Sequence, residues 1–335
     1  MIKYLARTIA MWAAMIVVAT NVTYFLAVRF LDPVSNYLGR RDGKTLEQQI
    51  SDAKAKLDGF NLNPDTPVME RWWTWLKGIV LHWDWGKSPT GVPITSEVSY
   101  RMWVSAQLVL AGTFLAVIIG VAIGVYTASR QYKLADRVWQ GISIITMNIH
   151  IVVASYLIVT VAVKFNDWTE ATWGTRFFYT TGASTTGVHG FFPVLLDIIR
   201  HLTLPTLSLI LISYAGYHMT QRTLLLDNIS ADYVRTARAK GMTRNTAIRK
   251  HALRTSIIPV ATSVAFSIPA VFTGAIMTET IFAWNGMGRY FIDTLGKNDV
   301  HGVVAVAAFG AVTTAIGAVL ADMFVVALDP RVRVS

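Results

Sequence analysis

The chain has 335 residues, of which 53% are hydrophobic and 15% charged, and its formal net charge at pH 7 is +10. The apolar residues occur in blocks long enough to cross a bilayer, which takes about 20 residues of helix, and this excludes an ordinary soluble domain. Cysteine is absent, which excludes disulfides and cysteine-based metal sites.

Six apolar blocks are predicted to be transmembrane helices, so the expected fold class is an all-α integral membrane protein. Lys3 and Arg7 precede the first block, which is longer than the apolar core of a secretory signal, and we interpret it as an uncleaved helix. The blocks cover residues 9–31, 102–128, 138–163, 202–225, 256–282 and 303–328.

The polar segments between these blocks give the expected organisation of the chain. Residues 1–31 form a cytoplasmic N-terminus and the first helix, 32–101 an extracytoplasmic loop, 102–328 the other five helices with a cytoplasmic segment at 229–255, and 329–335 a cytoplasmic tail.

The first outer loop is the longest polar segment. Thr45 and Gln48 have the spacing of a capping box, and Gly59 follows the helix that they predict over 45–57. Five tryptophans come next, and because indole rings prefer the headgroup layer, an anchor on the outer leaflet is favoured over a ligand site. They are Trp72, Trp73, Trp75, Trp83 and Trp85.

Basic residues gather in the loops of one side only. The segment from Arg222 to Arg254 holds eight Lys and Arg against Asp227 and Asp232, whereas the outer loop 32–101 holds nine basic and nine acidic residues. Basic loops mark the cytoplasmic side. Both termini are therefore predicted to be cytoplasmic in a multi-pass plasma-membrane protein, and the net charge needs no nucleic-acid partner.

A few residues inside the blocks suggest packing or polar contacts. Gly120 and Gly124, with Gly112 before them, have the spacing that lets two membrane helices approach closely. Glu279 and Asp322 allow two readings. One is a proton or cation relay of a secondary transporter; the other, which we favour, is a polar contact between helices five and six or with a partner subunit. His150, Asn148 and His218 are expected to be hydrogen-bonded interior groups rather than ligands.

Motifs of soluble enzymes are absent from the sequence. There is no phosphate-binding G-x-x-x-x-G-K-[ST] loop, no G-x-G-x-x-G fingerprint, no H-E-x-x-H and no G-x-S-x-G elbow. We therefore expect a non-catalytic chain without a cofactor or metal of its own. Any nucleotide used for ATP-driven work must be bound by another polypeptide.

The polar stretch 229–255 is the most informative feature of the sequence. Asp232 is expected to cap a short basic helix, Ala237 and Ala239 keep it slim, and Gly241 permits a turn before a second basic helix at 243–254. Such a pair can dock into a soluble partner, or it can lie against anionic lipid. The residues alone leave these two readings open.

This stretch resembles the cytoplasmic coupling motif of bacterial ABC-importer permeases, in the form found in the peptide and nickel branch. Arg235 and Thr236 stand where the general pattern has Glu and Ala, and Pro259 lies further from Gly241 than usual. The resemblance extends to the opening Tyr4-Leu5-Ala6-Arg7, to Trp75-Leu76 and Asp84-Trp85-Gly86, to Thr278-Glu279-Thr280-Ile281-Phe282 with Trp284, Gly286, Met287 and Gly288, and to Leu328-Asp329-Pro330-Arg331.

The resemblance implies a B-type permease subunit, similar to actinobacterial oligopeptide permeases. The implied fold is a six-helix type I importer permease with a large outer loop between helices 1 and 2. The implied partners are a C-type permease in a heterodimer, one or two ABC ATPase subunits or a fused ATPase that binds ATP and Mg, and an extracytoplasmic peptide-binding protein. Oligopeptides are favoured as cargo over dipeptides and nickel complexes.

Three sets of residues are predicted to carry this function, and the path set is taken from polarity and position. The alternative functions are a proton-coupled secondary transporter and a structural or enzymatic membrane subunit. The ATPase-coupling set is Asp232, Tyr233, Val234, Arg235, Thr236, Ala237, Arg238, Ala239, Lys240 and Gly241; the translocation path is Asn148, Tyr214, Phe266 and Glu279; the binding-protein contact is Trp284, Gly286, Met287, Gly288 and Arg289.

Overall fold

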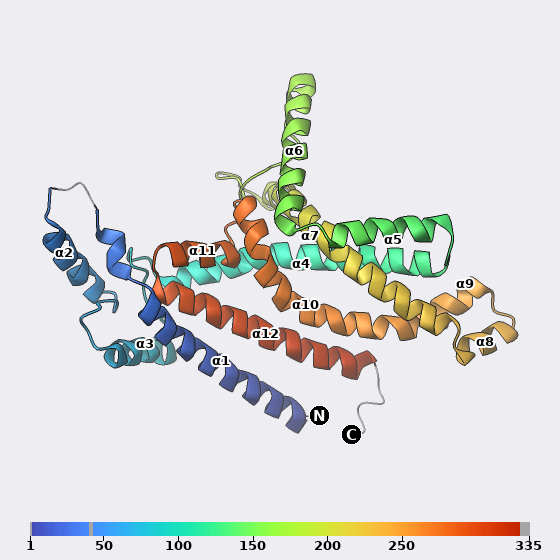
Figure 1. The fold of residues 1–335 in the computed structure, drawn as a ribbon, viewed down its shortest axis with the longest axis horizontal. Coiled ribbons are helices and arrows are strands. Elements are labelled where there is room, and N and C mark those ends of the chain that lie inside the picture. The colour runs from blue at the N-terminus through green and yellow to red at the C-terminus, as the bar shows by residue number, and fades with distance from the viewer. Residues whose placement is uncertain (1, 40–42, 329–335) are drawn as a thin grey trace. The chain divides into compact units, whose positions relative to one another are not determined.

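A computed structural model describes residues 2–39 and 43–328, and at 2–6, 265–274 and 324–328 it describes the backbone alone. The predicted tail 329–335 and the side chain of Phe266 therefore lie outside the described part. Within the described residues the chain is helical and contains no β-strand, which confirms the all-α class. The helices are labelled in Figure 1.

The chain divides into two compact units. The first contains Met1–Ser105 and Asn285–Ala315, and the second contains Ala106–Trp284 and Ile316–Ser335. Two long helices, α4 (Ile94–Ala128) and α12 (Val300–Leu328), contribute residues to both units.

Five helices among the described residues are long and apolar enough to cross a membrane. A sixth predicted span, 256–282, coincides with α10 (Leu253–Ile281), where ten side chains lie outside the description. The count of six spans therefore stays a prediction. The five are Arg7–Phe30, Ile94–Ala128, Ile151–Trp173, Phe191–Ile229 and Val300–Met323.

The prediction of one continuous helix over 138–163 is wrong. α5 (Leu134–Met147) ends at Asn148, whose Nδ2 donates to the Ile144 carbonyl at 2.7 Å. α6 (Ile151–Trp173) begins after His150, whose Nδ1 accepts from the Val152 amide at 3.3 Å, and in Figure 1 it turns away from α5. Two polar side chains thus end one helix and start the next, which the surrounding apolar residues conceal.

The first unit is built around α1 (Ile2–Phe30). The outer loop supplies η1 (Pro33–Tyr37), α2 (Leu46–Asp58) and α3 (Val68–His82), and α11 (Met287–Gly296) precedes α12. The predicted capping box is confirmed: Thr45 Oγ1 accepts from the Gln48 amide at 3.4 Å, and Gln48 Oε1 accepts from the Thr45 amide at 3.0 Å.

The tryptophans of the outer loop attach α3 to α1. Trp75 stacks on Tyr24 with ring centroids 4.7 Å apart, and Trp72 Nε1 donates to Asn21 Oδ1 at 2.7 Å. Trp73 and Trp83 are at least half exposed. Part of this cluster therefore builds the core of the unit, and the anchor on the outer leaflet stays a prediction for its exposed members.

The second unit is organised by α7 (Phe191–Ile229), which contacts α5, α6 and α10. A Cβ atom added at Gly120 would lie 2.6 Å from the Tyr214 carbonyl oxygen, and one at Gly124 would lie 2.9 Å from that of His218. Since no side chain fits in these gaps, the predicted close approach of this helix to a neighbour is confirmed, and the neighbour is α7.

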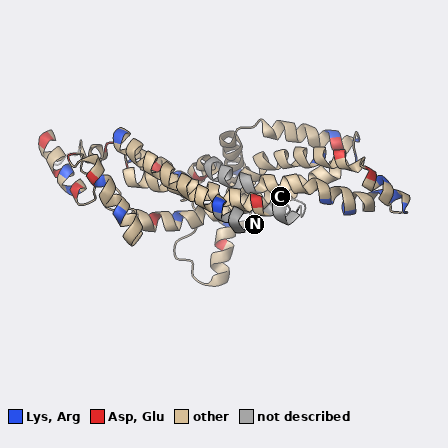
Figure 2. Ribbon diagram, turned by 90° about the horizontal axis from the view of Figure 1, so that it is seen from below, with Lys and Arg blue, Asp and Glu red and all other residues tan. Residues whose placement is uncertain are grey.

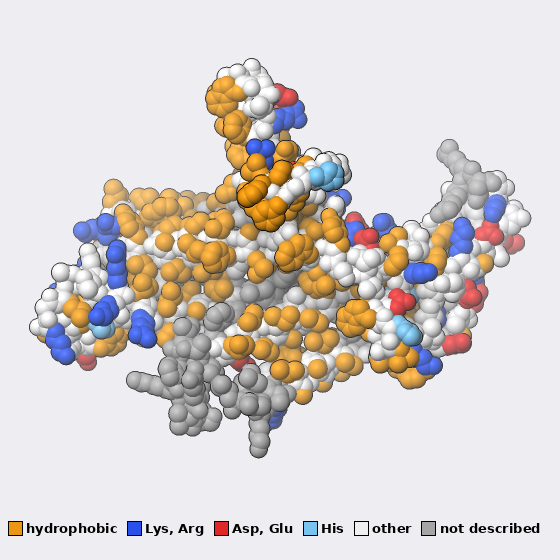
Figure 3. Space-filling model, turned by 180° about the vertical axis from the view of Figure 1, so that it is seen from behind, with side chains coloured by type: hydrophobic (Ala, Val, Ile, Leu, Met, Phe, Trp, Pro, Cys, Tyr) orange, Lys and Arg blue, Asp and Glu red, His pale blue; other side chains and the backbone are white. Residues whose placement is uncertain are grey.

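The surfaces of the long helices are largely apolar. Phe191 and Phe192 at the start of α7 are mostly exposed, as are Val18 and Leu26 of α1. Figure 3 shows hydrophobic side chains spread over the visible faces, with few charged side chains among them. A surface of this kind is stable in hydrocarbon and not in water.

Candidate functional site

The short helix α8 (Asp232–Ala239) lies in the predicted coupling segment, but Asp232 does not cap it. The capping position belongs to Ala231, which has extended backbone angles and no side-chain hydrogen bond. Asp232 is the first helical residue, and its exposed carboxylate lies 3.8 Å from the Arg235 guanidinium. Its carboxylate still stabilises α8, because a negative charge at the N-terminal end of a helix interacts favourably with the helix dipole.

α8 presents one apolar and one polar face. Val234 and Ala237 are buried in a cluster with Leu225 of α7 and with Ala252, which directly precedes α10. This spacing of three residues places both side chains on the same side. The rest of the predicted set is exposed, namely Asp232, Tyr233, Arg235, Thr236, Arg238, Ala239, Lys240 and Gly241.

Gly241 makes the turn that the sequence predicts. Its φ is +89°, a backbone conformation that costs an L-residue free energy. Its amide donates to the Arg238 carbonyl at 3.0 Å, and the Met242 amide donates to that of Ala237 at 3.3 Å, so the turn closes the end of α8.

The second helix begins as predicted, but it does not end at Arg254. Thr243 caps α9 (Arg244–Ala247) by accepting from the Thr246 amide at 3.3 Å. A π-helical turn, η2 (Ile248–Ala252), follows, and α10 then continues without interruption. α9, η2 and α10 therefore form one continuous helical segment.

Further contacts attach this region to the rest of the second unit. Arg244 Nη1 donates to the Ser129 carbonyl just after α4 at 3.2 Å, and the Tyr233 hydroxyl donates to Asn228 Oδ1. Figure 2 shows Lys and Arg gathered over α8 and α9 with few acidic residues between them. The exposed face of the segment is therefore basic, and its buried face is apolar and packs against the rest of the second unit.

A buried ion pair that the sequence analysis missed joins α5 to α7. Asp136 Oδ1 accepts from Arg222 Nε at 2.7 Å, and Oδ2 accepts from Arg222 Nη2 at 2.9 Å. The Tyr132 amide and Gln140 Nε2 complete the carboxylate's bonds at 2.9 and 2.8 Å. Hydrogen bonds from Arg222 hold the pKa of Asp136 below its ordinary value. In the sequence both residues contribute only to the charge of the predicted cytoplasmic loops, and nothing there indicates that they form a pair.

His218 lies deeper between the same helices. It is fully buried, and its ring nitrogens lie 3.1 Å from Thr127 Oγ1 of α4 and 2.6 Å from Ser143 Oγ of α5. The prediction of a hydrogen-bonded interior histidine is confirmed for His218 and is wrong for His150, which is exposed at the start of α6. One side chain of α7 thus contacts both neighbouring helices.

Three of the four predicted path residues have described side chains, and these three are not hydrogen-bonded to one another. Tyr214 of α7 is buried, and its hydroxyl lies 3.2 Å from Thr146 Oγ1. Glu279 is buried in α10, whereas Asn148 is exposed and bonds to its own helix. Among the described side chains, no hydrogen bond links Asn148, Tyr214 and Glu279 to one another. Their role in the path, and the choice between relay and interhelical contact for Glu279 and Asp322, stay predictions.

Most residues predicted to contact a binding protein are buried. Trp284 ends the second unit, and its amide donates to the Glu279 carbonyl at 2.7 Å. In the first unit Gly286, Met287 and Gly288 begin α11, where the Met287 amide donates to Ser105 Oγ at 2.7 Å. Arg289 is half-buried and bonds Asn285 at 3.0 Å. The contact therefore stays a prediction, with Arg289 its one accessible member.

A polar cavity of about 140 Å³ lies next to α11 in the first unit. Arg101 forms a 2.7 Å ion pair with Glu97 in its wall and stacks 4.6 Å from the Tyr290 ring centroid. Asp299 lines the same cavity, and burial raises its pKa to about 6. No group of three or more metal-ligating His, Asp or Glu side chains occurs in the described residues.

Comparison with known proteins gives the family. A family model described as "Binding-protein-dependent transport system inner membrane component" matches residues 120–334. The chain belongs to this family. The matched part contains α8, the Gly241 turn and the buried pair between α5 and α7.

Individual relatives extend the similarity to the whole chain. The oligopeptide transport system permease protein OppB of Mycobacterium tuberculosis (strain ATCC 25618 / H37Rv) is 35% identical, with all of both chains covered. AppB of Bacillus subtilis (strain 168), also an oligopeptide transport system permease protein, is 30% identical over 86% of this chain and 88% of its own. The dipeptide transport system permease protein DppB of Escherichia coli (strain K12) is 29% identical over 81% and 83%.

Family membership confirms several expectations from the sequence. The chain is a multi-pass, all-helical permease, and the resemblance to B-type permeases of the peptide and nickel ABC importers is confirmed. A permease subunit is a non-catalytic membrane component of its transport system. The chemistry that drives transport therefore belongs to other chains.

Proposed function

We propose that this chain is the permease subunit of an ATP-driven importer of oligopeptides, that it forms half of the translocation path, and that it couples to the ATPase through α8. The single observation that carries the proposal is the similarity to OppB along the whole length of both chains. The proposed cargo follows the printed function of that relative and of AppB.

α8 has the construction that force transmission needs. Its apolar face is fixed by Val234 and Ala237, and its exposed basic face is free to contact a soluble ATPase. When the ATPase pair closes on ATP, a displaced α8 pulls on α7 through the cluster that contains Leu225, and on α10 through α9 and η2. Packed interiors transmit such displacements because they contain few voids.

The polar layer between α4, α5 and α7 extends this path of transmission. Asp136 and Arg222 fix the start of α5 to α7, and His218 links α7 to α4 and α5. These three helices therefore respond to α8 together. We propose that Asn148, Tyr214, Phe266 and Glu279 face the path, and that Arg289 contacts the binding protein.

The proposed complex contains a C-type permease, two ABC ATPase subunits or one fused ATPase that binds ATP and Mg, and an extracytoplasmic peptide-binding protein. α8 lies on the cytoplasmic side of the plasma membrane because its loop carries the excess of basic residues. Both termini lie on the same side. Ligand binding changes the state of the transporter only as far as it favours one state over another.

The test is uptake of labelled oligopeptide by proteoliposomes that contain the complete complex, with ATP inside. A double reversal, Arg235→Glu with Arg238→Glu, changes only exposed side chains of α8. We expect it to abolish uptake and uncouple ATP hydrolysis while the complex stays assembled. Lys133→Glu, an exposed reversal before α5, is the matched control and should transport normally.

Two results contradict the proposal. If the Arg235→Glu, Arg238→Glu variant takes up peptide normally and its ATP hydrolysis is unchanged, α8 is not the coupling element. Uptake that needs a proton gradient and no ATP refutes the proposed ATP-driven importer and favours a proton relay through Glu279 and Asp322.

A further inference from the structure

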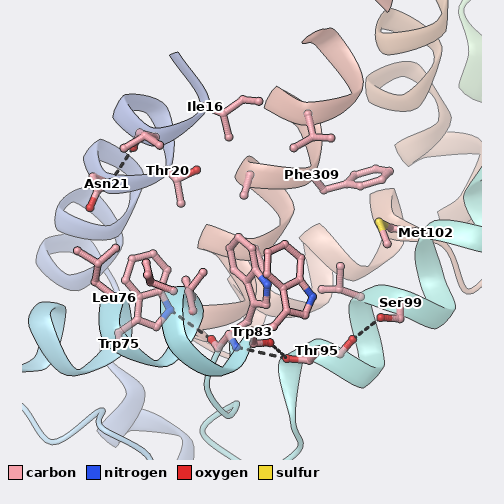
Figure 4. Close-up of a pocket in the computed structure, with 18 residues that line it drawn as sticks. Ile16, Thr20, Asn21, Trp75, Leu76, Trp83, Thr95, Ser99, Met102 and Phe309 are labelled. Carbon is pink, nitrogen blue, oxygen red and sulfur yellow. Dashed lines mark hydrogen bonds between the residues drawn. The ribbon is translucent and has the colours of Figure 1, made fainter. Parts of the chain in front are cut away.

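An apolar groove of about 480 Å³ lies in the first unit between α1, α3, α4 and α12. Figure 4 shows Ile16 and Phe309 at one end, and Trp83 and Thr95 at the other. The volume is within the range of about 300–1,000 Å³ typical of small-ligand sites. No residue of the proposed coupling segment or path lines the groove.

The groove opens at membrane depth. Val17 of α1 lines it and is 59% exposed, and Val312 of α12 lines it and is 40% exposed. Both belong to helices that are long and apolar enough to span a bilayer. The wall of the groove is thus continuous with the apolar surface that α1 turns to the membrane, where Val18 and Val22 are also exposed. A molecule that occupies the groove therefore enters from the hydrocarbon core of the bilayer.

One end of the groove carries hydrogen-bond donors suited to the membrane interface. Trp83 and Trp85 line this end, and among the described residues neither indole N–H donates a hydrogen bond. The neighbouring Trp75 already donates to the Trp85 carbonyl at 3.3 Å. Tryptophan with its N–H toward the headgroups is the usual arrangement at a bilayer surface.

Thr20 supplies a donor slightly deeper in the groove. It lies one helical turn from Tyr24, which stacks on Trp75, and its side chain points into the groove in Figure 4. It is only 7% exposed, and its Oγ1 has no hydrogen-bond partner. Thr23, three residues later, donates instead to the Ala19 carbonyl at 2.8 Å. A buried hydroxyl without a partner is costly, so its position suggests that a ligand accepts from it.

We propose that this groove binds one acyl chain of a bilayer phospholipid. The chain lies along Ile16, Phe309 and Val312, its ester carbonyl accepts from Thr20, and the glycerol end lies at the Trp83 and Trp85 nitrogens. Donors at one end and a wholly apolar continuation match an ester-linked lipid. The apolar side chain of a transported peptide would have to enter from the hydrocarbon side, and this makes it the weaker occupant.

Photolabelling tests the proposal on the wild-type protein. The full-length chain with its partner subunits is placed in phosphatidylcholine vesicles that contain a phosphatidylcholine with a diazirine in the acyl chain, and the label is mapped by mass spectrometry. We expect labelling of Ile16, Phe309 and Val312 above that of Val18, which faces the membrane outside the groove. Equal labelling of Val18 and the groove residues would overturn the proposal.

Three variants sharpen the test. Ile16→Trp fills the groove and should abolish labelling of Phe309, whereas Val18→Trp, two residues away on the exposed face, should leave it unchanged. Thr20→Val should reduce labelling by the ester-linked probe to the level of an ether-linked one. Loss of the label when a transported oligopeptide is added, or labelling that occurs only when the partner permease is left out, assigns the groove to those occupants and refutes the proposal.

Discussion

The buried pair of Asp136 and Arg222 yields a quantitative prediction for stability. The Asp136 side chain is 1% exposed and that of Arg222 14% exposed, and the carboxylate accepts four hydrogen bonds. Asp136→Asn removes the negative charge and leaves a mostly buried guanidinium without its counter-charge. Breaking one partner of a buried ion pair costs about 3–5 kcal/mol. At roughly 2 °C per kcal/mol for a chain of this size, the midpoint of thermal unfolding should fall by about 6–10 °C.

The assay is thermal unfolding of the purified protein in detergent, followed by tryptophan fluorescence. Asp227→Asn is the matched control, because it removes an exposed carboxylate from the same helix as Arg222. The control should unfold within about 1 °C of the wild type, since surface substitutions usually change stability by less than 0.5 kcal/mol.

A second variant separates charge from packing. Asp136→Leu combined with Arg222→Met removes both charges, and apolar replacement of a buried pair is often nearly neutral. We therefore expect the double variant to recover most of the loss of Asp136→Asn. If the double variant unfolds no later than the single one, or if Asp136→Asn matches the control, the pair does not stabilise the contact between α5 and α7.

The pH dependence of this pair has a definite sign. The folded pKa of Asp136 lies below its unfolded value of about 3.9. The stabilisation is therefore complete above about pH 5 and is lost as the pH falls through the folded pKa. The difference between wild type and Asp136→Asn should be constant from pH 5 to 8 and should shrink in stronger acid.

Three further predictions use the same thermal assay. Gly120→Ala should destabilise the protein because its Cβ would overlap the Tyr214 carbonyl, whereas Gly216→Ala, with open space around it, should stabilise by about 1 kcal/mol; equal effects would contradict the close packing. Gly241→Ala should cost about 1–2 kcal/mol because of its positive φ, and no loss would show that the turn is relaxed. Because burial raises the folded pKa of Asp299 to about 6, stability should fall by up to about 3 kcal/mol between pH 4 and pH 7. Asp299→Asn should remove this fall, and an unchanged pH profile would refute it.

Local chemistry explains which details the sequence predicted well. The capping box at Thr45 and Gln48, the turn at Gly241 and the start of the second helix at Thr243 all depend on residues within a few positions of one another. The residue type alone also indicates the close approach at Gly120, because only glycine leaves room for a neighbouring backbone. Such features can be read from spacing alone.

Details that depend on distant residues could not be read in this way. The span 138–163 looked continuous because hydropathy averages over Asn148 and His150, which end and start helices through their own hydrogen bonds. Asp232 looked like a cap, but the backbone turns one residue earlier, at Ala231. The contact residues around Met287 looked exposed because they lie in a predicted loop, whereas packing buries them.

The sequence by itself determined that this chain is a helical membrane permease and predicted a cytoplasmic coupling segment at 229–255, because hydropathy, loop charge and local motifs act over short distances along the chain. Only the tertiary structure decided that Asp136 meets Arg222, that His218 lies between two neighbouring helices, and that Thr20 opens into an apolar groove. These contacts join residues from separate helices. Helix packing brings them together, and no pattern along the sequence records which helices will be neighbours.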